Sequence, residues 1–294
     1  MGIMDALENA LLSADDPIVT DYGLYSLGRN LVAKREWAGE PIEPVPTTWS
    51  QADARAATAT LRERGAIAPD ADFNSSVWRI VQSSRSGTAE EVACIADPFC
   101  YVSHLSAMQR YGLTDRSPVA LHLTTPAREV WNTLRDAKLV EELGADADLD
   151  HPALSHVGFS DSIRRRPVVV HETRRPARPV PIRGERARIT SIGRTFVDML
   201  SEPRLSGGMQ HVLDVWEGEA PQWSDRIIEA IDDQDAQQIV KVRAGYILSE
   251  RLGIEDARID NWLMFAQRGG SRKLDPDSPY SADYSERWMI SLNV

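Results

Sequence analysis

Residues 50–68, SQADARAATATLRERGAIA, predict a helix that leads into the first strand of a hairpin. Ser50 is a good N-cap residue, and Asp53, three positions later, supplies the acid of a capping box. The helix ends at Gly65, because glycine accepts the backbone conformation that terminates a helix. A polar turn and a second apolar run, complete by residue 81, predict the rest of the hairpin.

The predicted helix separates two kinds of side chain onto two faces. Small and apolar residues recur at helical spacing on one face, namely Ala54, Ala57 and Leu61. Polar residues at i, i+4, i+7 and i+11 form the other face, namely Gln51, Arg55, Thr58 and Arg62. Such a helix, after another helix and before a two-stranded wing, is typical of a winged helix-turn-helix that contacts base edges in the major groove. Ordinary solvated helices show the same charge spacing.

The chain is long enough for two domains and has an α+β pattern. We expect a winged helix-turn-helix DNA-binding domain over residues 1–86 and a mixed α+β domain over residues 87–294, joined by a Ser/Gly-rich linker at residues 83–87. Helices are expected over residues 1–16, 21–37, 51–64, 99–111, 129–143, 208–216, 224–231 and 237–252. Strands are expected over residues 66–68, 77–81, 119–123, 168–170 and 288–292.

An arginine-rich segment stands out in an acidic chain whose formal net charge is -11. Between residues 155 and 190 there are nine arginines and three acidic residues: Arg164, Arg165, Arg166, Arg174, Arg175, Arg178, Arg183, Arg186 and Arg188 against Asp161, Glu172 and Glu185. Like charges repel, so an anionic surface is needed to compensate the positive charge of these arginines. That surface is nucleic acid, an acidic partner protein, or the acids just upstream, namely Glu141, Glu142, Asp146, Asp148 and Asp150.

The composition favours a cytoplasmic, reduced protein that is not an enzyme. No stretch approaches the length of a membrane-spanning helix, and the acidic N-terminus does not resemble a signal peptide. There is no phosphate-binding Gly-x-x-x-x-Gly-Lys-Ser/Thr loop and no His-Glu-x-x-His motif. Cys94 and Cys100 are too few for a four-ligand zinc site and are expected to be small buried residues. We therefore expect no catalytic residues, no metal and no cofactor.

Several short motifs in the second predicted domain resemble those of AbiEi-type antitoxins. The family has an Arg-Thr-hydrophobic-hydrophobic-Asp helix and a Pro-x-Leu-x-Gly-Gly turn, and residues 192–208 resemble both. Residues 101–113 resemble its Ser-Ala-x-x-x-x-Gly-Leu helix, and residues 243–248 resemble its Arg-x-Gly-Tyr-hydrophobic-Leu helix. Leu274-Asp275-Pro276 and Arg287-Trp288-Met289-Ile290 to Asn293 resemble the closing motifs. Together these motifs span roughly residues 97–294.

The resemblance implies a fold and a role. Such antitoxins pair an N-terminal winged helix with an α+β domain, bind inverted repeats in their own promoter, and repress a type IV toxin–antitoxin operon linked to phage defence. They counter a nucleotidyltransferase toxin without a stable complex. This chain is more acidic than a promoter-binding protein suggests, with eight Lys/Arg against twelve Asp/Glu through Gly87. One copy is therefore expected to bind DNA weakly, as a monomer or a weak dimer.

These observations predict a non-enzymatic transcriptional autorepressor that binds double-stranded DNA. Base contacts are expected from Gln51, Arg55, Thr58 and Arg62. Phosphate contacts are expected from Arg79 on the hairpin and from Arg164, Arg165 and Arg166. The alternative is a protein-interaction module in which residues 164–188 bind an acidic partner. Within the second domain, Arg194 and Asp198 are expected to pair on one helix face. Gly207-Gly208 is expected to form a turn whose backbone conformation excludes residues that carry a Cβ.

Overall fold

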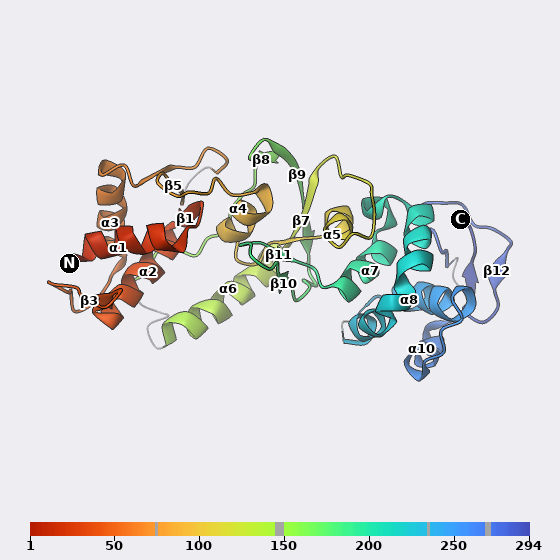
Figure 1. The fold of residues 1–294 in the computed structure, drawn as a ribbon. Coiled ribbons are helices and arrows are strands. Elements are labelled where there is room, and N and C mark those ends of the chain that lie inside the picture. The colour runs from red at the N-terminus through yellow and green to blue at the C-terminus, as the bar shows by residue number, and fades with distance from the viewer. Residues whose placement is uncertain (74–75, 145–149, 234–235, 268–271) are drawn as a thin grey trace. The chain divides into compact units, whose positions relative to one another are not determined.

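The structure is a computed structural model that describes residues 1–73, 76–144, 150–233, 236–267 and 272–294. Its helices and short strands make it an α+β protein, as the sequence predicts (Figure 1). The chain divides into two compact units. The first comprises Met1–Tyr101, Leu123–Pro176 and Pro181–Arg188, and the second comprises Val102–His122, Ala177–Val180 and Ile189–Val294. The predicted domain boundary after residue 86 remains a prediction.

Helices and strands alternate along the N-terminal half of the chain (Figure 1). In order they are α1 (Ile3–Ala14), β1 (Ile18–Thr20), α2 (Asp21–Lys34), β2 (Glu36–Trp37), β3 (Glu40–Pro41), α3 (Gln51–Glu63), β4 (Ile67–Pro69), β5 (Val77–Ile80), α4 (Ala89–Ala96), β6 (Tyr101–Val102), α5 (His104–Arg110), β7 (Leu121–Pro126) and α6 (Arg128–Leu143).

The C-terminal half begins with strands and continues mostly with helices. In order they are β8 (Ser162–Ile163), β9 (Arg166–Thr173), β10 (Val180–Pro181), β11 (Arg188–Ile189), α7 (Ile192–Ser201), the 3-10 helix η2 (Pro203–Ser206), α8 (Met209–Asp233), α9 (Gln238–Gly245), the π-helix η3 (Tyr246–Arg251), α10 (Ala257–Asn261), the 3-10 helix η4 (Trp262–Phe265), β12 (Tyr284–Ser285) and β13 (Ile290–Ser291).

The capping box predicted for α3 is present. The Asp53 amide donates to the Ser50 hydroxyl over 3.2 Å, and the Ser50 amide donates to the Asp53 carboxylate over 2.8 Å. Both bonds satisfy amides that a helix start leaves without partners. The predicted apolar stripe is also confirmed, because Ala54, Ala57 and Leu61 are buried. The small alanines let α3 pack closely in the core of the first unit.

The two strands after α3 join β1, which precedes α2, in a three-stranded antiparallel sheet with β5 between β1 and β4. Its register pairs Arg79 of β5 with Ile18 on one side and Ala68 on the other. The hairpin predicted at this place is therefore confirmed, although residues 74–75 of its turn lie outside the described residues. β1 had not been predicted, because three residues between two helices carry too little periodicity.

The core of the first unit joins α1, α2 and α3. Leu7, Leu24 and Leu61 are fully buried members of this core. Trp49, just before α3, packs against Gly28 of α2, where a Cβ atom would lie 2.3 Å from the indole ring. Glycine at residue 28 therefore allows the ring to approach the helix backbone.

In the second unit, α7 and α8 pack closely around an apolar core. Phe196 and Trp216 meet edge to face with ring centroids 5.3 Å apart. The predicted pair on α7 is confirmed, since Arg194 Nε lies 2.8 Å from Asp198 Oδ1. The predicted turn is also confirmed, because Gly207 and Gly208 have φ angles of 93° and 90°. Such angles favour glycine because they strain residues that carry a Cβ.

One predicted break between helices is wrong. The helices predicted over residues 208–216 and 224–231 are parts of a single helix, α8 (Met209–Asp233), which runs through Pro221. Proline removes one backbone hydrogen bond and usually breaks or kinks a helix. Here the continuous apolar face of α8, with Trp216, Ala220 and Ile227 fully buried, favours keeping the helix in one piece.

Candidate nucleic-acid interface

The predicted polar face of α3 is present but not uniformly accessible. Arg55 and Arg62 are exposed, whereas Gln51 and Thr58 are half-buried. The Thr58 hydroxyl donates to the Ala54 carbonyl of its own helix over 2.9 Å. The Arg62 guanidinium lies over the Trp78 ring of β5, 5.2 Å from its centroid. The two arginines are therefore the members of this face with the greatest reach toward solvent.

A segment from further along the chain borders the same face. The four predicted base-contacting residues line a cavity of about 310 Å³ together with Pro152, Ala153 and Ser155. The backbone amide of Gln51 also donates to the backbone carbonyl of Asp150 over 3.3 Å. No periodicity in the sequence connects residues 150–155 with α3, so sequence reasoning missed this wall of the site.

A second groove lies beside the hairpin. It has a volume of about 690 Å³ and is lined by Arg79, Arg85, Arg164 and Arg165 together with Asp70 and Asp72 and the serines at 83, 84 and 86. Arg79 and Arg165 are exposed. The structure thus brings three predicted phosphate contacts, Arg79, Arg164 and Arg165, to one groove.

Arg164 lines this groove but is held by carboxylates. Its Nη2 atom lies 2.7 Å from Asp70 Oδ2, and its Nη1 atom also contacts Asp72. Its side chain is 22% exposed, and that of Asp70 is 1% exposed. Arg164 and Arg165 both have positive φ angles, 51° and 64°, in the turn that joins β8 to β9. These angles are uncommon for residues with a Cβ, so the ion pairs hold a strained turn in place.

Other arginines of the segment are paired within the first unit. Arg166 Nη1 lies 2.5 Å from Glu90 Oε1, and Arg186 Nε lies 2.6 Å from Asp16 Oδ1. Arg188 donates to the backbone carbonyls of Cys94, Asp97 and Cys100, near the C-terminal end of α4. Its guanidinium therefore stabilises the end of that helix.

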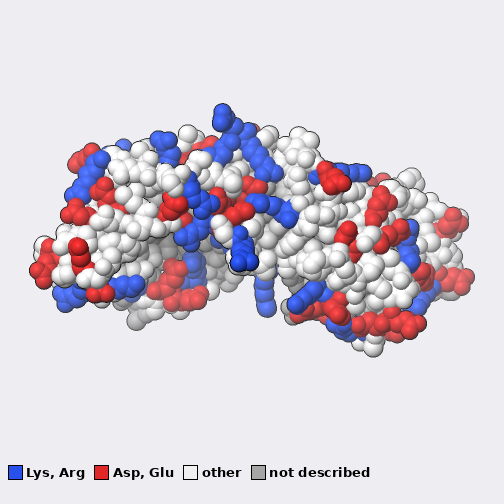
Figure 2. Space-filling model, in the orientation of Figure 1, with Lys and Arg blue, Asp and Glu red and all other residues white. Residues whose placement is uncertain are grey.

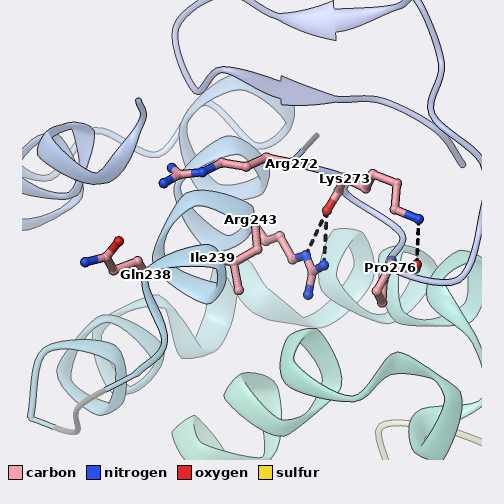
Figure 3. A pocket seen from close by; sticks show the side chains of 6 residues that line it. All are labelled: Gln238, Ile239, Arg243, Arg272, Lys273 and Pro276. Carbon is pink, nitrogen blue, oxygen red and sulfur yellow. Dashed lines mark hydrogen bonds between the residues drawn. The ribbon is translucent and has the colours of Figure 1, made fainter. Parts of the chain in front are cut away.

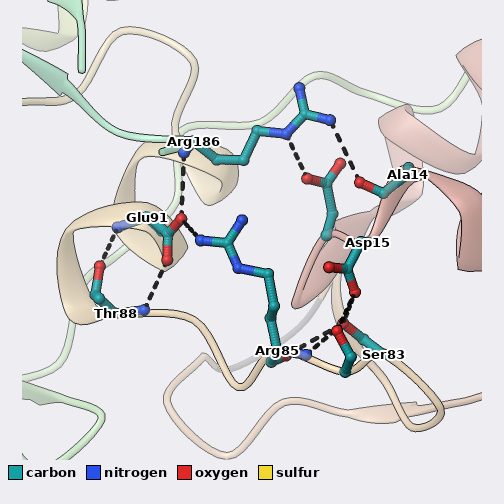
Figure 4. Close-up of polar contacts among 9 residues, drawn as sticks. Ala14, Asp15, Ser83, Arg85, Thr88, Glu91 and Arg186 are labelled. Atoms are coloured by element: carbon teal, nitrogen blue, oxygen red, sulfur yellow. Dashed lines mark hydrogen bonds and ion pairs between the residues drawn. The ribbon is translucent and has the colours of Figure 1, made fainter. Parts of the chain in front are cut away.

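Glu91 at the start of α4 contacts Arg186 of this segment and also Arg85 (Figure 4). Its carboxylate accepts from the Arg186 amide over 3.3 Å and contacts the Arg85 guanidinium. Burial opposes the charge on Glu91, but the amides of Thr88 and Arg186 and the charge of Arg85 outweigh it. The pKa of Glu91 is therefore below its ordinary value.

Ion pairs within the chain thus neutralise some of the arginines of the segment, but the acids involved differ from those expected. Asp70, Asp72, Glu90 and Asp16 supply the carboxylates. Of the acids expected as partners, Glu142 instead accepts from the Tyr22 hydroxyl and pairs with Lys138. Asp146 and Asp148 lie outside the described residues. On the face drawn in Figure 2, basic and acidic side chains are interspersed.

The arginines that remain exposed are spread over the segment. They are Arg165, Arg174, Arg175, Arg178 and Arg183, and Arg186 is also exposed although it pairs with Asp16. Their exposure places these side chains in contact with solvent.

Serine, histidine and glutamate side chains form a chain in the second unit that sequence reasoning missed. Ser103 Oγ lies 2.8 Å from His104 Nδ1, and His104 Nε2 lies 3.2 Å from Glu202 Oε2. Ser103 is fully buried, so its hydroxyl is closed to a substrate. Within the described residues, no group of His, Cys, Asp and Glu side chains could hold a metal ion. Cys94 and Cys100 are free and buried, as expected.

Comparisons with known proteins find little. No protein-family model matches the chain, and no curated protein matches it. Among solved structures, the fold resembles the crystal structure of the RV2827C protein from Mycobacterium tuberculosis, with a TM-score of 0.47 and 11% sequence identity. That alignment covers 98% of this chain and 90% of the other. Within the described residues, no helix is both long and apolar enough to cross a membrane.

Proposed function

We propose that this chain is a sequence-specific DNA-binding protein that represses its own promoter, with residues 1–86 acting as a winged helix-turn-helix. The observation that carries the proposal is that Arg55 and Arg62 are exposed on one face of α3, directly before a two-stranded hairpin. The order is α1-β1-α2-β2-β3-α3-β4-β5, with β5 central in the three-stranded sheet. Apart from the short β2-β3 pair between α2 and α3, this order is typical of winged-helix domains.

The chemistry of the two helix arginines suits base recognition. Arginine donates two parallel hydrogen bonds to guanine in the major groove, the commonest specific contact between proteins and DNA. Arg55 and Arg62 therefore carry the main base contacts in this proposal. Gln51 and Thr58 are half-buried and act at the edges of the contact. Because residues 152–155 border the face, DNA approaches α3 from its exposed side.

Phosphate contacts are assigned to the groove beside the hairpin. Arg79 and Arg165 are exposed there and can neutralise phosphates of the DNA backbone. Arg164 and Arg166 are paired with carboxylates, so they hold the groove in shape and contribute less charge to DNA. The net charge of -11 lowers the affinity of a single copy, so two copies on an inverted repeat are needed for tight binding.

The test is binding of the purified full chain to its own upstream DNA and to a scrambled duplex, across a salt series. We expect a preference for the upstream DNA and a steep loss of affinity between about 50 and 200 mM salt. Arg55→Ala combined with Arg62→Ala should weaken the specific complex at least about tenfold, since each contact contributes about 1–3 kcal/mol.

A matched control is Arg226→Ala, whose side chain is 68% exposed on α8 of the second unit. It should leave DNA affinity unchanged. Equal affinity of the wild type for both duplexes would contradict the repressor proposal. Loss of affinity in the control as large as in the double variant would contradict the assignment of the site to α3.

The AbiEi-type resemblance extends the proposal to an antitoxin that counters a nucleotidyltransferase toxin. In that role the chain restores the growth of cells that express such a toxin. Arg55→Ala with Arg62→Ala should still restore growth, because the resemblance places the antitoxin motifs in residues 97–294, outside α3. Failure of the wild-type chain to restore growth would remove the antitoxin role and leave the DNA proposal standing.

A second candidate is a protein-interaction module that binds an acidic partner. The observation in its favour is the exposure of Arg174, Arg175 and Arg183 after β9. Charge replacement at these three positions should abolish capture of the partner but leave DNA binding through α3 intact. Absence of any DNA retention at low salt would favour this candidate over the repressor.

A further inference from the structure

A cavity of about 350 Å³ in the second unit is walled by three cationic side chains. Arg243 of α9, Arg272 and Lys273 line it together with Gln238, Ile239 and Pro276 (Figure 3). Among the described residues that line the cavity, none is acidic. Its volume lies at the lower end of the range for small-molecule sites.

Arg243 is the unusual member of this group. It is 5% exposed, yet all three of its hydrogen bonds go to backbone carbonyl oxygens. Nη1 donates to Leu200 over 2.7 Å, and Nε and Nη2 each donate to Lys273 over 3.1 Å. A guanidinium has five N–H groups, so within the described residues two of them remain for another acceptor. Buried charges are normally paired with an opposite charge, and carbonyl oxygens carry only partial charge.

The other two cations share this pattern in the described part of the chain. Arg272 Nη1 donates to the Phe265 carbonyl, and Lys273 Nζ donates to the carbonyls of Pro276 and Ser278. Neither forms an ion pair with a described carboxylate. The group therefore has an excess of positive charge at the wall of a cavity.

Nearby acids compensate this charge only in part. Burial lowers the pKa of Arg243 to about 10, while Asp275 and Asp277 act in the opposite direction. The Asp275 carboxylate accepts from the Asp277 amide over 2.9 Å and from the Ser278 hydroxyl over 2.6 Å, and acts on Arg243 through its charge rather than through a direct ion pair. An anion bound in the cavity would supply the missing counter-charge and acceptors.

We propose that this cavity binds a small phosphorylated molecule, with Arg243 and Arg272 as its cationic contacts. Phosphate carries close to two negative charges and presents several acceptor oxygens, which suits guanidinium donors better than a single carboxylate does. Figure 3 shows the Arg243 and Arg272 guanidinium groups pointing to opposite sides of the view. A ligand that contacts both is therefore an extended anion, such as the diphosphate of a nucleotide.

The test is isothermal titration calorimetry of the full chain with pyrophosphate, ADP and inorganic phosphate, at constant ionic strength. We expect one site that binds pyrophosphate or ADP more tightly than inorganic phosphate. Tighter binding of ADP than pyrophosphate identifies a nucleotide as the source of the diphosphate, and the reverse identifies the free anion. Absence of binding by either diphosphate at millimolar concentration would overturn the proposal.

Arg272→Gln is the deciding variant, because Arg272 is only half-buried and its loss should not unfold the chain. It should weaken diphosphate binding at least about tenfold, as expected for a lost charged hydrogen bond. Arg226→Gln, away from the cavity wall, should bind as the wild type does. Arg243→Lys keeps the charge but loses the planar donors, so it should also weaken binding where thermal unfolding shows it folded.

Wild-type diphosphate affinity in Arg272→Gln would overturn the proposal. Arg243 would then have only a structural role, in which it joins two backbone carbonyls by hydrogen bonds. The outcome is independent of DNA binding. The chain with both Arg55→Ala and Arg62→Ala should retain the diphosphate site, because none of these residues lines the cavity.

Discussion

The Arg164 guanidinium is paired with the buried carboxylate of Asp70, with 2.7 Å between Nη2 and Oδ2. Arg165, the next residue, is exposed beside the same groove. Two adjacent arginines in one turn therefore have different roles. Arg164 is neutralised by a carboxylate of the chain, whereas Arg165 is exposed and can bind an external anion.

Replacement of these two arginines should affect the free energy of unfolding unequally. Arg164→Gln leaves Asp70 buried without its cation, so we expect the free energy of unfolding to fall by about 3 kcal/mol. Arg165→Gln should change it by less than about 0.5 kcal/mol, because exposed positions contribute little. Urea denaturation of both variants measures the difference. Equal losses would show that the ion pair does not hold the turn.

The capping box at the start of α3 should contribute measurably to stability. Ser50→Ala removes the acceptor for the Asp53 amide, so we expect a loss of about 1 kcal/mol in urea denaturation. Thr60→Ala on the same helix is the control. It removes a hydroxyl bonded only to the Ala56 carbonyl, and alanine favours the helix, so stability should be unchanged or slightly higher.

Glu91 should make stability depend on pH in the acid range. Its pKa in the folded chain lies below the ordinary value of 4.5, so its ionised form favours the folded state. This stabilisation is complete above about pH 4.5 and is lost as the pH falls through the lower folded value. Glu91→Gln should therefore be less stable than the wild type at pH 7, with a smaller difference at pH 3. A difference that grows on acidification would contradict the assignment.

Two glycines in helices of the second unit should respond oppositely to alanine. At Gly245 a Cβ would lie 2.1 Å from the Trp288 ring, so Gly245→Ala should destabilise the unit by about 1–3 kcal/mol or more. At Gly218 a Cβ meets nothing within 4 Å, so Gly218→Ala should stabilise α8 by about 0.5–1 kcal/mol. Thermal unfolding of both variants tests whether close packing, rather than helix propensity, selects glycine at residue 245.

Local features of this chain could be predicted from sequence because neighbouring residues create them. The capping box of Ser50 and Asp53, the buried stripe of α3 and the Arg194–Asp198 pair each depend on spacing within one helix. Features that depend on residues far apart in the chain could not be predicted in this way. Pro221 suggested a break that the core packing of α8 overrides. Arg164 and Arg166 pair with Asp70, Asp72 and Glu90, and not with any described acid just upstream of the arginine segment.

The candidate site shows the same division. Gln51, Arg55, Thr58 and Arg62 fall on one face of α3 because the helical period places them there. The sequence by itself therefore determined the α+β class, the start of α3 and the face that its arginines share. Tertiary structure decided which arginines are neutralised, which segment borders that face, and that Arg243, Arg272 and Lys273 wall one cavity. The reason is that charge pairing and cavity formation join residues far apart in the chain, whose distances no local pattern encodes.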